Sequence, residues 1–145
     1  MSAPGAPWPR AAPLSTERLV LEPLGPEHAT ELAPVLDDPA LHAYTGGEPA
    51  TEEELRARFT RQAAGHSPDG SEGWLNWVAR DRATRAPVGI VQATIGEDAG
   101  GRTAAVAWTV ATSRQGEGLA TEAARAAMDW LRARSSSSVA GSPPV

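Results

Sequence analysis

The chain has 145 residues, a net charge of −5 and an apolar fraction of 41%, which suit one domain with a packed core. This charge argues against broad binding to nucleic acid or to anionic membranes, and no segment reaches the ~20 apolar residues of a membrane span. Without cysteine or lysine, the chain lacks disulfides, thiolate zinc sites, Schiff bases and the lysine-containing phosphate loop. No secretory signal is visible, so we expect a cytoplasmic protein.

The first third of the chain predicts a tail, a strand and a helix. Residues 1–13 are rich in proline and alanine, and we expect them to form a disordered tail. Residues 17–24 alternate apolar side chains with others, which predicts a first strand. Residues 25–39 predict a helix, because a proline and a glutamate suit its first turn and a later proline ends it. We expect His28, within this segment, at the surface.

The segment "TEEELRARFTRQAAG" predicts a second and stronger helix. Thr51 and Glu54 have the spacing of a capping box, in which each side chain binds the other residue's backbone N–H. Glutamates fill the first turn and arginines follow, as the helix dipole favours. Leu55 and Phe59, four residues apart, supply one buried stripe.

Three further strands are predicted in "WLNWVAR", "VGIVQATIGE" and "TAAVAWTVA". Short polar or glycine-containing turns separate them, which predicts an antiparallel meander. Trp74 and Trp77 are three residues apart, so they cannot both face the core of a regular strand. A long helix from about Gly118 to Arg134 follows. We interpret the charged residues Glu122, Arg125, Asp129 and Arg132 of that helix as a solvated face.

Small residues occupy the start of this last helix, in "RQGEGLATEA". The first N–H groups of a helix have no intrahelical partner and carry a partial positive charge, which makes the site a natural seat for phosphate. Gly116 and Gly118 let the backbone approach an anion without a Cβ in the way, and Ala120 keeps the first turn slim. A plain turn into a helix is the alternative interpretation. The dinucleotide pattern GxGxxG does not fit, because Thr121 stands at its last position.

The stretch "QGEGLA" matches the Q/RxxGxG/A pattern of GNAT-type N-acetyltransferases. The continuation "LATEAARA" and the opening "STERLVLEPL" resemble the branch that acetylates protein N-termini, ribosomal proteins and small amines. The resemblance covers Leu14 to about Arg134. It implies acetyl-CoA as co-substrate without a metal, and direct attack of a primary amine, on a small molecule or a peptide, on the thioester.

The resemblance also implies which residues contact acetyl-CoA. The pantetheine arm would pair with the backbone of Thr109, Val110 and Ala111. The pyrophosphate would bind the backbone amides from Gln115 through Gly116, Glu117, Gly118 and Leu119 to Ala120, with a hydroxyl contact from Thr121.

Catalytic residues are not assigned. Relatives often carry a glutamate as general base where this chain has Ala105, and often supply a tyrosine or serine as acid beyond the last helix. Tyr44, the single tyrosine, and Trp108 are expected in the wall and floor of the acceptor pocket.

Together these features predict an α/β (α+β) fold whose mixed, mostly antiparallel sheet has helices on both faces. We expect a partial acetyltransferase domain over 14–134 and a disordered Ser/Pro-rich tail over 135–145. The sheet would then lack the C-terminal strands of the family, and its open edge predicts a homodimer. Two functions remain open: an N-acetyltransferase, and a non-catalytic remnant or CoA-binding module.

Overall fold

The structure is a computed structural model, which describes residues 8–36, 51–98, 100–111, 114–134 and 138–141. Its elements, in chain order, are β1 (Leu14–Ser15), β2 (Leu19–Pro23), the 3-10 turn η1 (Pro26–His28), α1 (Ala29–Leu36), α2 (Glu52–Gln62), β3 (Gly73–Asp81), β4 (Pro87–Asp98), β5 (Gly101–Val110), α3 (Leu119–Arg134) and β6 (Ser138–Gly141). The predicted order of strand, helices, three-strand meander and long helix is confirmed.

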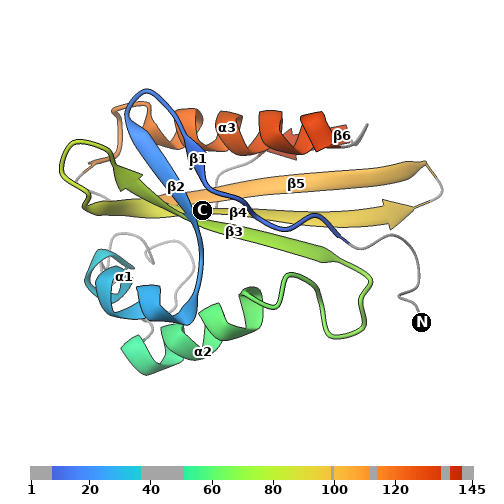
Figure 1. The fold of residues 1–145 in the computed structure, drawn as a ribbon, viewed down its shortest axis with the longest axis horizontal. Helices are drawn as coiled ribbons and strands as arrows, with labels where there is room; N and C mark the ends of the chain where they lie inside the picture. The colour runs from blue at the N-terminus through green and yellow to red at the C-terminus, as the bar shows by residue number, and fades with distance from the viewer. Residues whose placement is uncertain (1–7, 37–50, 99, 112–113, 135–137, 142–145) are drawn as a thin grey trace.

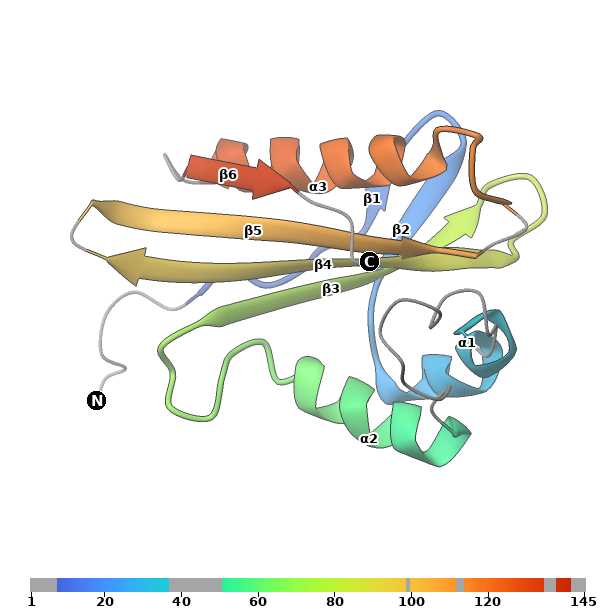
Figure 2. The same cartoon turned by 180° about the vertical axis from the view of Figure 1, so that it is seen from behind.

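One sheet contains the six described strands in the order β1-β2-β3-β4-β5-β6. Neighbouring strands are antiparallel, except that β6 runs parallel to β5. In Figures 1 and 2, α3 covers one face of the sheet while α1 and α2 lie against the other. The predicted fold class, a mixed and mostly antiparallel sheet with helices on both faces, is therefore confirmed.

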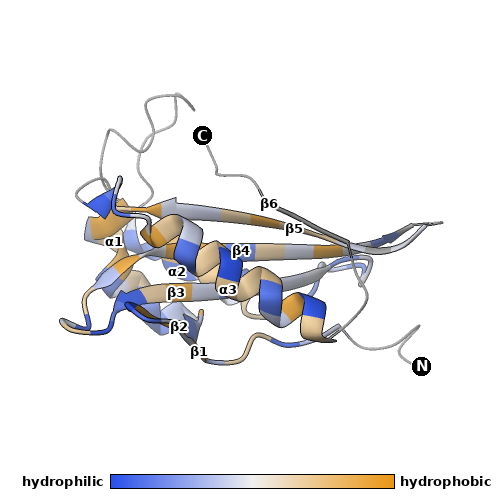
Figure 3. Cartoon of the chain, turned by 90° about the horizontal axis from the view of Figure 1, so that it is seen from above, coloured by the Kyte–Doolittle hydropathy of each residue, from blue (hydrophilic) through white to orange (hydrophobic). Residues whose placement is uncertain are grey.

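Alternation along the central strands creates two cores, one on each face of the sheet. The core under α3 contains Trp77 and Val91 from the strands and Leu131 from the helix. The core under α1 and α2 contains Val78 and Ile90 from the same strands. Figure 3 shows hydrophilic residues recurring along the outer surface of α3, which keeps its apolar stripe for the sheet.

The two tryptophans of β3 face opposite sides, as their spacing predicts. Trp77 is fully buried, and its ring meets that of Trp130 edge to face at a centroid distance of 5.8 Å. Its indole N–H donates to Ala12 O at 2.9 Å. Trp74 is only partly buried and lies on the α2 side of the sheet. The α2 side of this strand therefore carries an aromatic side chain that the core does not use.

Local signals at the two N-terminal helices are borne out with one exception. Thr51 and Glu54 form the predicted capping box, with N–H···O distances of 2.8 and 3.1 Å. His28 is 7% exposed, so the expected surface position is wrong. Its Nδ1 accepts a hydrogen bond from Gly25 N–H at 3.0 Å, which fixes the turn between β2 and α1.

Residues 8–13, which we expected to belong to a disordered tail, make defined contacts with the sheet. Trp8 packs over Gly73, where a Cβ would lie 2.7 Å from its ring, and its Nε1–H donates to Gly70 O at 3.1 Å. Together with the bond from Trp77 to Ala12 O, these contacts hold the segment beside β3.

The segment 135–145, which we expected to be unstructured throughout, contains β6. Its backbone pairs with Thr103–Val106 of β5, so the expectation that this edge of the sheet is wholly open is wrong. The pairing uses main-chain groups, which any non-proline residue supplies, and the Ser/Pro-rich composition hid it. In the described residues, β6 covers only the first part of β5, and Ala107–Val110 pair with β4 alone.

Deletion of residues 135–145 tests the pairing of β6. Odd-numbered residues of β5 bond β4, so the amides of Ala104 and Val106 point toward β6. We expect hydrogen exchange of these two amides to accelerate about tenfold or more, and that of Thr103 and Ala105 to change less. NMR-detected exchange measures all four amides together. An unchanged rate at Ala104 and Val106 would show that β6 does not pair there.

Candidate functional site

The loop between β5 and α3 is shaped by two glycines in the left-handed region. Gly116 has φ = 86° and Gly118 has φ = 81°, values at which any L side chain is strained. No atom lies within 4 Å of a Cβ built at Gly116, and at Gly118 the nearest is Arg18 Nη2, at 3.5 Å. The surface in front of both glycines is therefore open to a ligand that approaches the backbone closely.

The N-terminus of α3 has no side-chain cap in the described structure. Gly118 stands at the N-cap position, where its carbonyl accepts from Glu122 N–H at 3.1 Å. Because glycine has no side chain, it cannot satisfy the first N–H groups as a serine or aspartate would. The side chain of Leu119 is buried in the core, which anchors this first turn. The helix therefore presents unpaired donors and its positive end to the loop surface.

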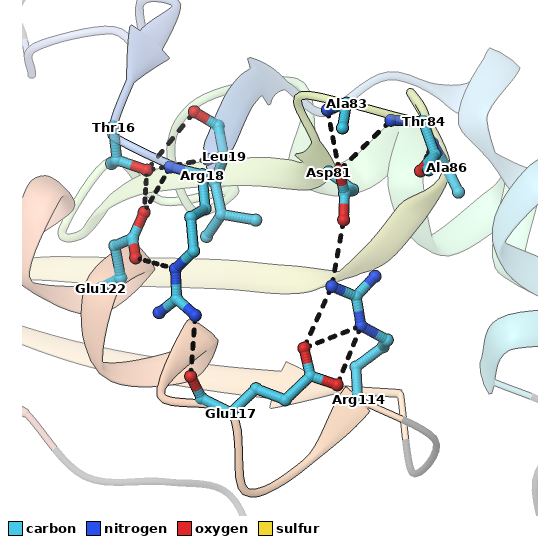
Figure 4. Close-up of polar contacts among 10 residues, drawn as sticks. All are labelled: Thr16, Arg18, Leu19, Asp81, Ala83, Thr84, Ala86, Arg114, Glu117 and Glu122. Carbon is cyan, nitrogen blue, oxygen red and sulfur yellow. Dashed lines mark hydrogen bonds and ion pairs between the residues drawn. The ribbon is translucent and has the colours of Figure 1, made fainter.

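Two arginines fix the loop from opposite sides (Figure 4). Arg18 donates from Nη1 to Glu117 O at 2.9 Å and from Nε to Glu122 Oε1 at 2.8 Å. Arg114 donates from Nη2 to Asp81 Oδ2 at 3.0 Å and from Nε to Glu117 Oε1 at 3.1 Å. These contacts connect the loop to the β1–β2 turn and to the end of β3, so its shape is set before any ligand binds.

Glu122 belongs to this framework, which corrects its interpretation as part of a solvated face. Its carboxylate also accepts hydrogen bonds from the Thr16 hydroxyl and from Arg18 N–H, and its side chain is 19% exposed. Burial alone would raise the pKa of Glu122, but the bonds from Thr16 and Arg18 together hold it below its usual value. Hydrogen bonds from Ala83 N–H and Arg114 likewise lower the pKa of Asp81.

A groove of about 410 Å³ continues from the loop along α3. It is lined by Thr16, Arg18, Gly118, Thr121, Glu122, Arg125, Ala126 and Asp129. Two arginines, Arg18 and Arg125, and two acids, Glu122 and Asp129, line the groove together, and Thr121 supplies a hydroxyl. Of the residues predicted to bind the cofactor, Gly118 and Thr121 thus border this groove.

The part of β5 that β6 does not cover in the described residues presents only alternate residues to that edge. Ala111 N–H bonds Val88 O at 2.8 Å, so the backbone groups of Thr109 and Ala111 point to β4. Those of Trp108 and Val110 point outward. Gln115 Nε2 donates to Val110 O at 3.1 Å, which leaves Val110 N–H and Trp108 O for another partner. Of the three residues predicted for this contact, only Val110 has its groups on the open edge.

The α2 side of the sheet contains a second concave site, a cavity of about 360 Å³. It is lined by Arg58, Arg61 and Gln62 of α2, Trp74 and Asn76 of β3, Gln92, Ala93 and Thr94 of β4, and Ala105 and Ala107 of β5. Toward α1 this face of the sheet is apolar, with Val78 and Ile90. Further along the same strands it becomes polar, with Asn76 and Gln92 opposite one another.

Two amide side chains of this cavity lack a hydrogen-bond partner among the described residues. Asn76 is 8% exposed, and no hydrogen bond of its side chain is found there. Gln62 Oε1 is a buried acceptor that receives no hydrogen bond. Buried polar groups are normally satisfied, because an unmade hydrogen bond costs about 1–3 kcal/mol. Such groups beside a cavity indicate a place where a bound molecule supplies the missing partners.

The residues predicted for the acceptor pocket are not brought together. Tyr44 lies outside the described residues. Trp108 packs against the core under α3, on the opposite face of β5 from Ala105 and Ala107. Trp74 is the aromatic residue that lines the cavity. Ala105, at the position where relatives often carry a base, is exposed on the cavity floor.

Within the described ranges, no group of three or more His, Cys, Asp or Glu side chains is arranged to hold a metal ion. The helices described there include none that is long and apolar enough to cross a membrane.

Comparison with known proteins gives a consistent family assignment. A sequence profile described as "Acetyltransferase (GNAT) domain" matches residues 18–140. A structure described as a GNAT-family acetyltransferase from Bordetella pertussis is similar to the chain at a TM-score of 0.64 and 23% identity, covering 86% of this chain and 74% of that one. A ribosomal-protein-alanine N-acetyltransferase from Brucella melitensis gives 0.59 and 19%, covering 87% and 81%.

RimL, described as a ribosomal L7/L12 alpha-N-protein acetyltransferase, is also similar, with a TM-score of 0.66, 15% identity and coverage of 89% and 71%. At these identities the structural likeness shows the fold. No curated protein sequence matches the chain.

Replacing Glu122 with glutamine tests the framework that holds the loop. We expect the free energy of unfolding to fall by about 1–2 kcal/mol at neutral pH, because charge-assisted hydrogen bonds are lost. The native pKa lies below the ordinary value of 4.5, so this stabilisation is complete above that value and is lost as pH falls through the native pKa. The difference between wild type and Glu122→Gln should therefore shrink below about pH 4.5.

Urea titrations at neutral and acidic pH measure this difference. Glu53→Gln, at an exposed position in the first turn of α2, is the control for loss of a charge alone and should lower the free energy of unfolding by less, about 0.3–1 kcal/mol at neutral pH. If Glu122→Gln destabilises the protein equally at neutral and acidic pH, the carboxylate charge is not what holds the loop.

Proposed function

Since the chain belongs to the GNAT family of acetyltransferases, we propose that it transfers the acetyl group of acetyl-CoA to a primary amine. The observation that carries the proposal is the N-terminus of α3, which no described side chain caps, next to the part of β5 that no described strand covers. The N-terminus of α3 is suited to a phosphate group, and the edge of β5 is suited to an extended arm with amide groups. Acetyl-CoA contains both, in that order, between its nucleotide and its thioester.

Acetyl-CoA is proposed to lie across the two features as follows. The N–H groups at the start of α3, with the glycine loop from Gln115 to Ala120, bind the pyrophosphate. The groove along α3 accepts the nucleotide, with Arg125 near its phosphates. The pantetheine arm pairs with Val110 N–H and Trp108 O, the outward groups of β5. This assigns the edge to the ligand, and the homodimer expected from an open edge is not needed to cover it.

The acceptor amine is proposed to enter from the cavity on the α2 side. Its floor is formed by Ala105 and Ala107, on the strand that holds the pantetheine arm. The amine lone pair attacks the thioester carbonyl carbon, the C–S bond breaks, and CoA leaves as the thiol after it gains a proton. The attacking nitrogen loses one proton to solvent. The protein contributes chiefly by placing both reactants in reach of each other.

No carboxylate or histidine is found among the described residues that line this cavity. Acids close to it along the chain include Glu72, which accepts from Trp74 Nε1 at 3.2 Å, and Glu54, one turn before Arg58. Arg58 and Arg61 make the cavity positive, and neighbouring cations favour the neutral form of an amine. We therefore propose that the acceptor reacts as an amine that is already deprotonated.

The absence of an acid or base at Ala105 also favours a second function. The chain would then bind CoA as a non-catalytic module, using the loop and the edge of β5 but transferring no acetyl group. Acetyl transfer to any amine in a thiol-release assay distinguishes the two functions.

Substitution of Gly118 by alanine tests the pyrophosphate seat. Gly70 has nearly the same φ, 76° against 81°, and lies far from the loop, so Gly70→Ala matches the backbone strain. Each substitution should cost about 1 kcal/mol of stability. We expect CoA affinity, measured by titration calorimetry, to fall at least about tenfold in Gly118→Ala alone, or ~1.4 kcal/mol. Equal affinity in the two folded variants would show that the loop does not bind the ligand.

The pH dependence of the acetyl-transfer rate tests the proposed lack of a base. The rate should follow the fraction of neutral amine, rising with pH and levelling off near the pKa of the acceptor. Using two acceptors with different pKa values should move the profile by the same difference. If the rate rises with pH around the pKa of a carboxylate for both acceptors, an enzyme base is identified. Glu72→Gln would then be the variant to examine.

A further inference from the structure

The cavity on the α2 side carries a charge and hydrogen-bonding pattern that the proposed acetyl transfer does not itself require. Arg58, Arg61 and Gln62 line it from one face of α2, where residues three and four apart lie side by side. No ion pair of Arg58 or Arg61 is found among the described residues, although the charge of Arg58 contributes to the lowered pKa of Glu54, one turn earlier. On the same helix, Arg56 is paired with Glu52 at 2.8 Å. The two cavity arginines are therefore available to a bound molecule.

The opposite wall is formed by neutral amides. Asn76 and Gln92 are cross-strand neighbours on β3 and β4, and their amide N–H groups can donate to an anion. Asn76 is 8% exposed and its amide, which makes no hydrogen bond to another described residue, borders the cavity, while Gln62 Oε1 is a buried acceptor without a partner among the described residues. A molecule with both acceptor oxygens and N–H groups would satisfy the two walls together.

On the basis of the proposed acetyl transfer, we propose that the acceptor is an amine that carries a carboxylate close to its amino group. The carboxylate binds Arg58, Arg61 and the facing amides, while the amino group lies over Ala105. Two sources share this chemistry: the N-terminus of an acidic peptide and a free amino acid. Polyamines do not fit, because no described residue lining the cavity carries a negative charge to bind a second ammonium.

Acetyl transfer by the full chain to four acceptors tests the charge preference. These are a peptide beginning Ser-Glu-Glu, one beginning Ser-Lys-Lys, free glutamate and spermidine. We expect KM for the acidic peptide to lie about tenfold or more below that for the basic one, with similar kcat. A low KM for glutamate as well would identify the free amino acid as sufficient, and a low KM for the peptide alone would identify the peptide N-terminus. Equal KM for the two peptides, or preference for spermidine, would overturn the proposal.

Variants of α2 locate the preference. Arg58→Gln and Arg61→Gln change exposed residues, so the fold should persist, and each should raise KM for the acidic peptide about fivefold to tenfold with little change for the basic one. Arg56→Gln, on the same helix but outside the cavity, should leave both values unchanged. An equal rise in KM for both peptides, or an equal effect of Arg56→Gln on KM, would count against these two arginines as the carboxylate site.

Binding without turnover separates this proposal from the proposed function. In the presence of CoA, the acidic peptide should shift the Trp74 indole N–H signal in NMR spectra of the wild type, and spermidine should not. In Arg61→Gln the midpoint of this titration should move to about fivefold to tenfold higher peptide concentration. If the acidic peptide binds in this way but no acetyl group is transferred, the proposed function fails and the charge preference stands. If spermidine causes the shift and the acidic peptide does not, the charge preference fails whatever the turnover.

Discussion

The hydrogen bond from Ala111 N–H to Val88 O fixes the direction of every backbone group in β5. Because directions alternate along a strand, one set of groups belongs to β4 and the other faces outward. β6 uses the outward groups over Thr103–Val106, and the next ones, at Trp108 and Val110, are left at the edge of the described sheet. In the described sheet, this edge of β5 is covered at one end and open at the other. The open end can pair with one extended ligand, and it lies where the chain turns into α3.

Residues 114–118, which lead into α3, are held by paired charges before any ligand arrives. Arg18 and Arg114 hold Glu117 from two sides, while Glu122 connects α3 to the β1–β2 turn. The carboxylates that pair with these two arginines neutralise their charge. The N-terminus of α3 is then the exposed positive element. A site ordered in advance loses less entropy on binding than one that must fold around its ligand. The same strands place a polar cavity on the far face, so the two reactants approach β5 from different sides.

Local features could be predicted from the sequence, and pairings between distant segments could not. The capping box of Thr51 and Glu54 and the meander depend on spacing along the chain, so pattern alone identified them. The bond between Arg18 and Glu122 joins residues 104 positions apart, and nothing in either neighbourhood indicates it. β6 was missed because backbone pairing leaves no periodic signal in a serine-rich segment. Asn76 did leave a signal in the sequence, because it is a polar residue among the apolar residues of a buried strand.

The central claim is that acetyl-CoA binds along the open part of β5 and at the start of α3. Residue-resolved amide hydrogen exchange, measured with and without saturating acetyl-CoA, tests it directly. The account predicts slower exchange for Val110, which points outward, and for the first-turn amides of Leu119 and Ala120, with little change for Thr109, which is already bonded to β4. Slower exchange elsewhere on the sheet, with Val110 and the first turn of α3 unaffected, would contradict it.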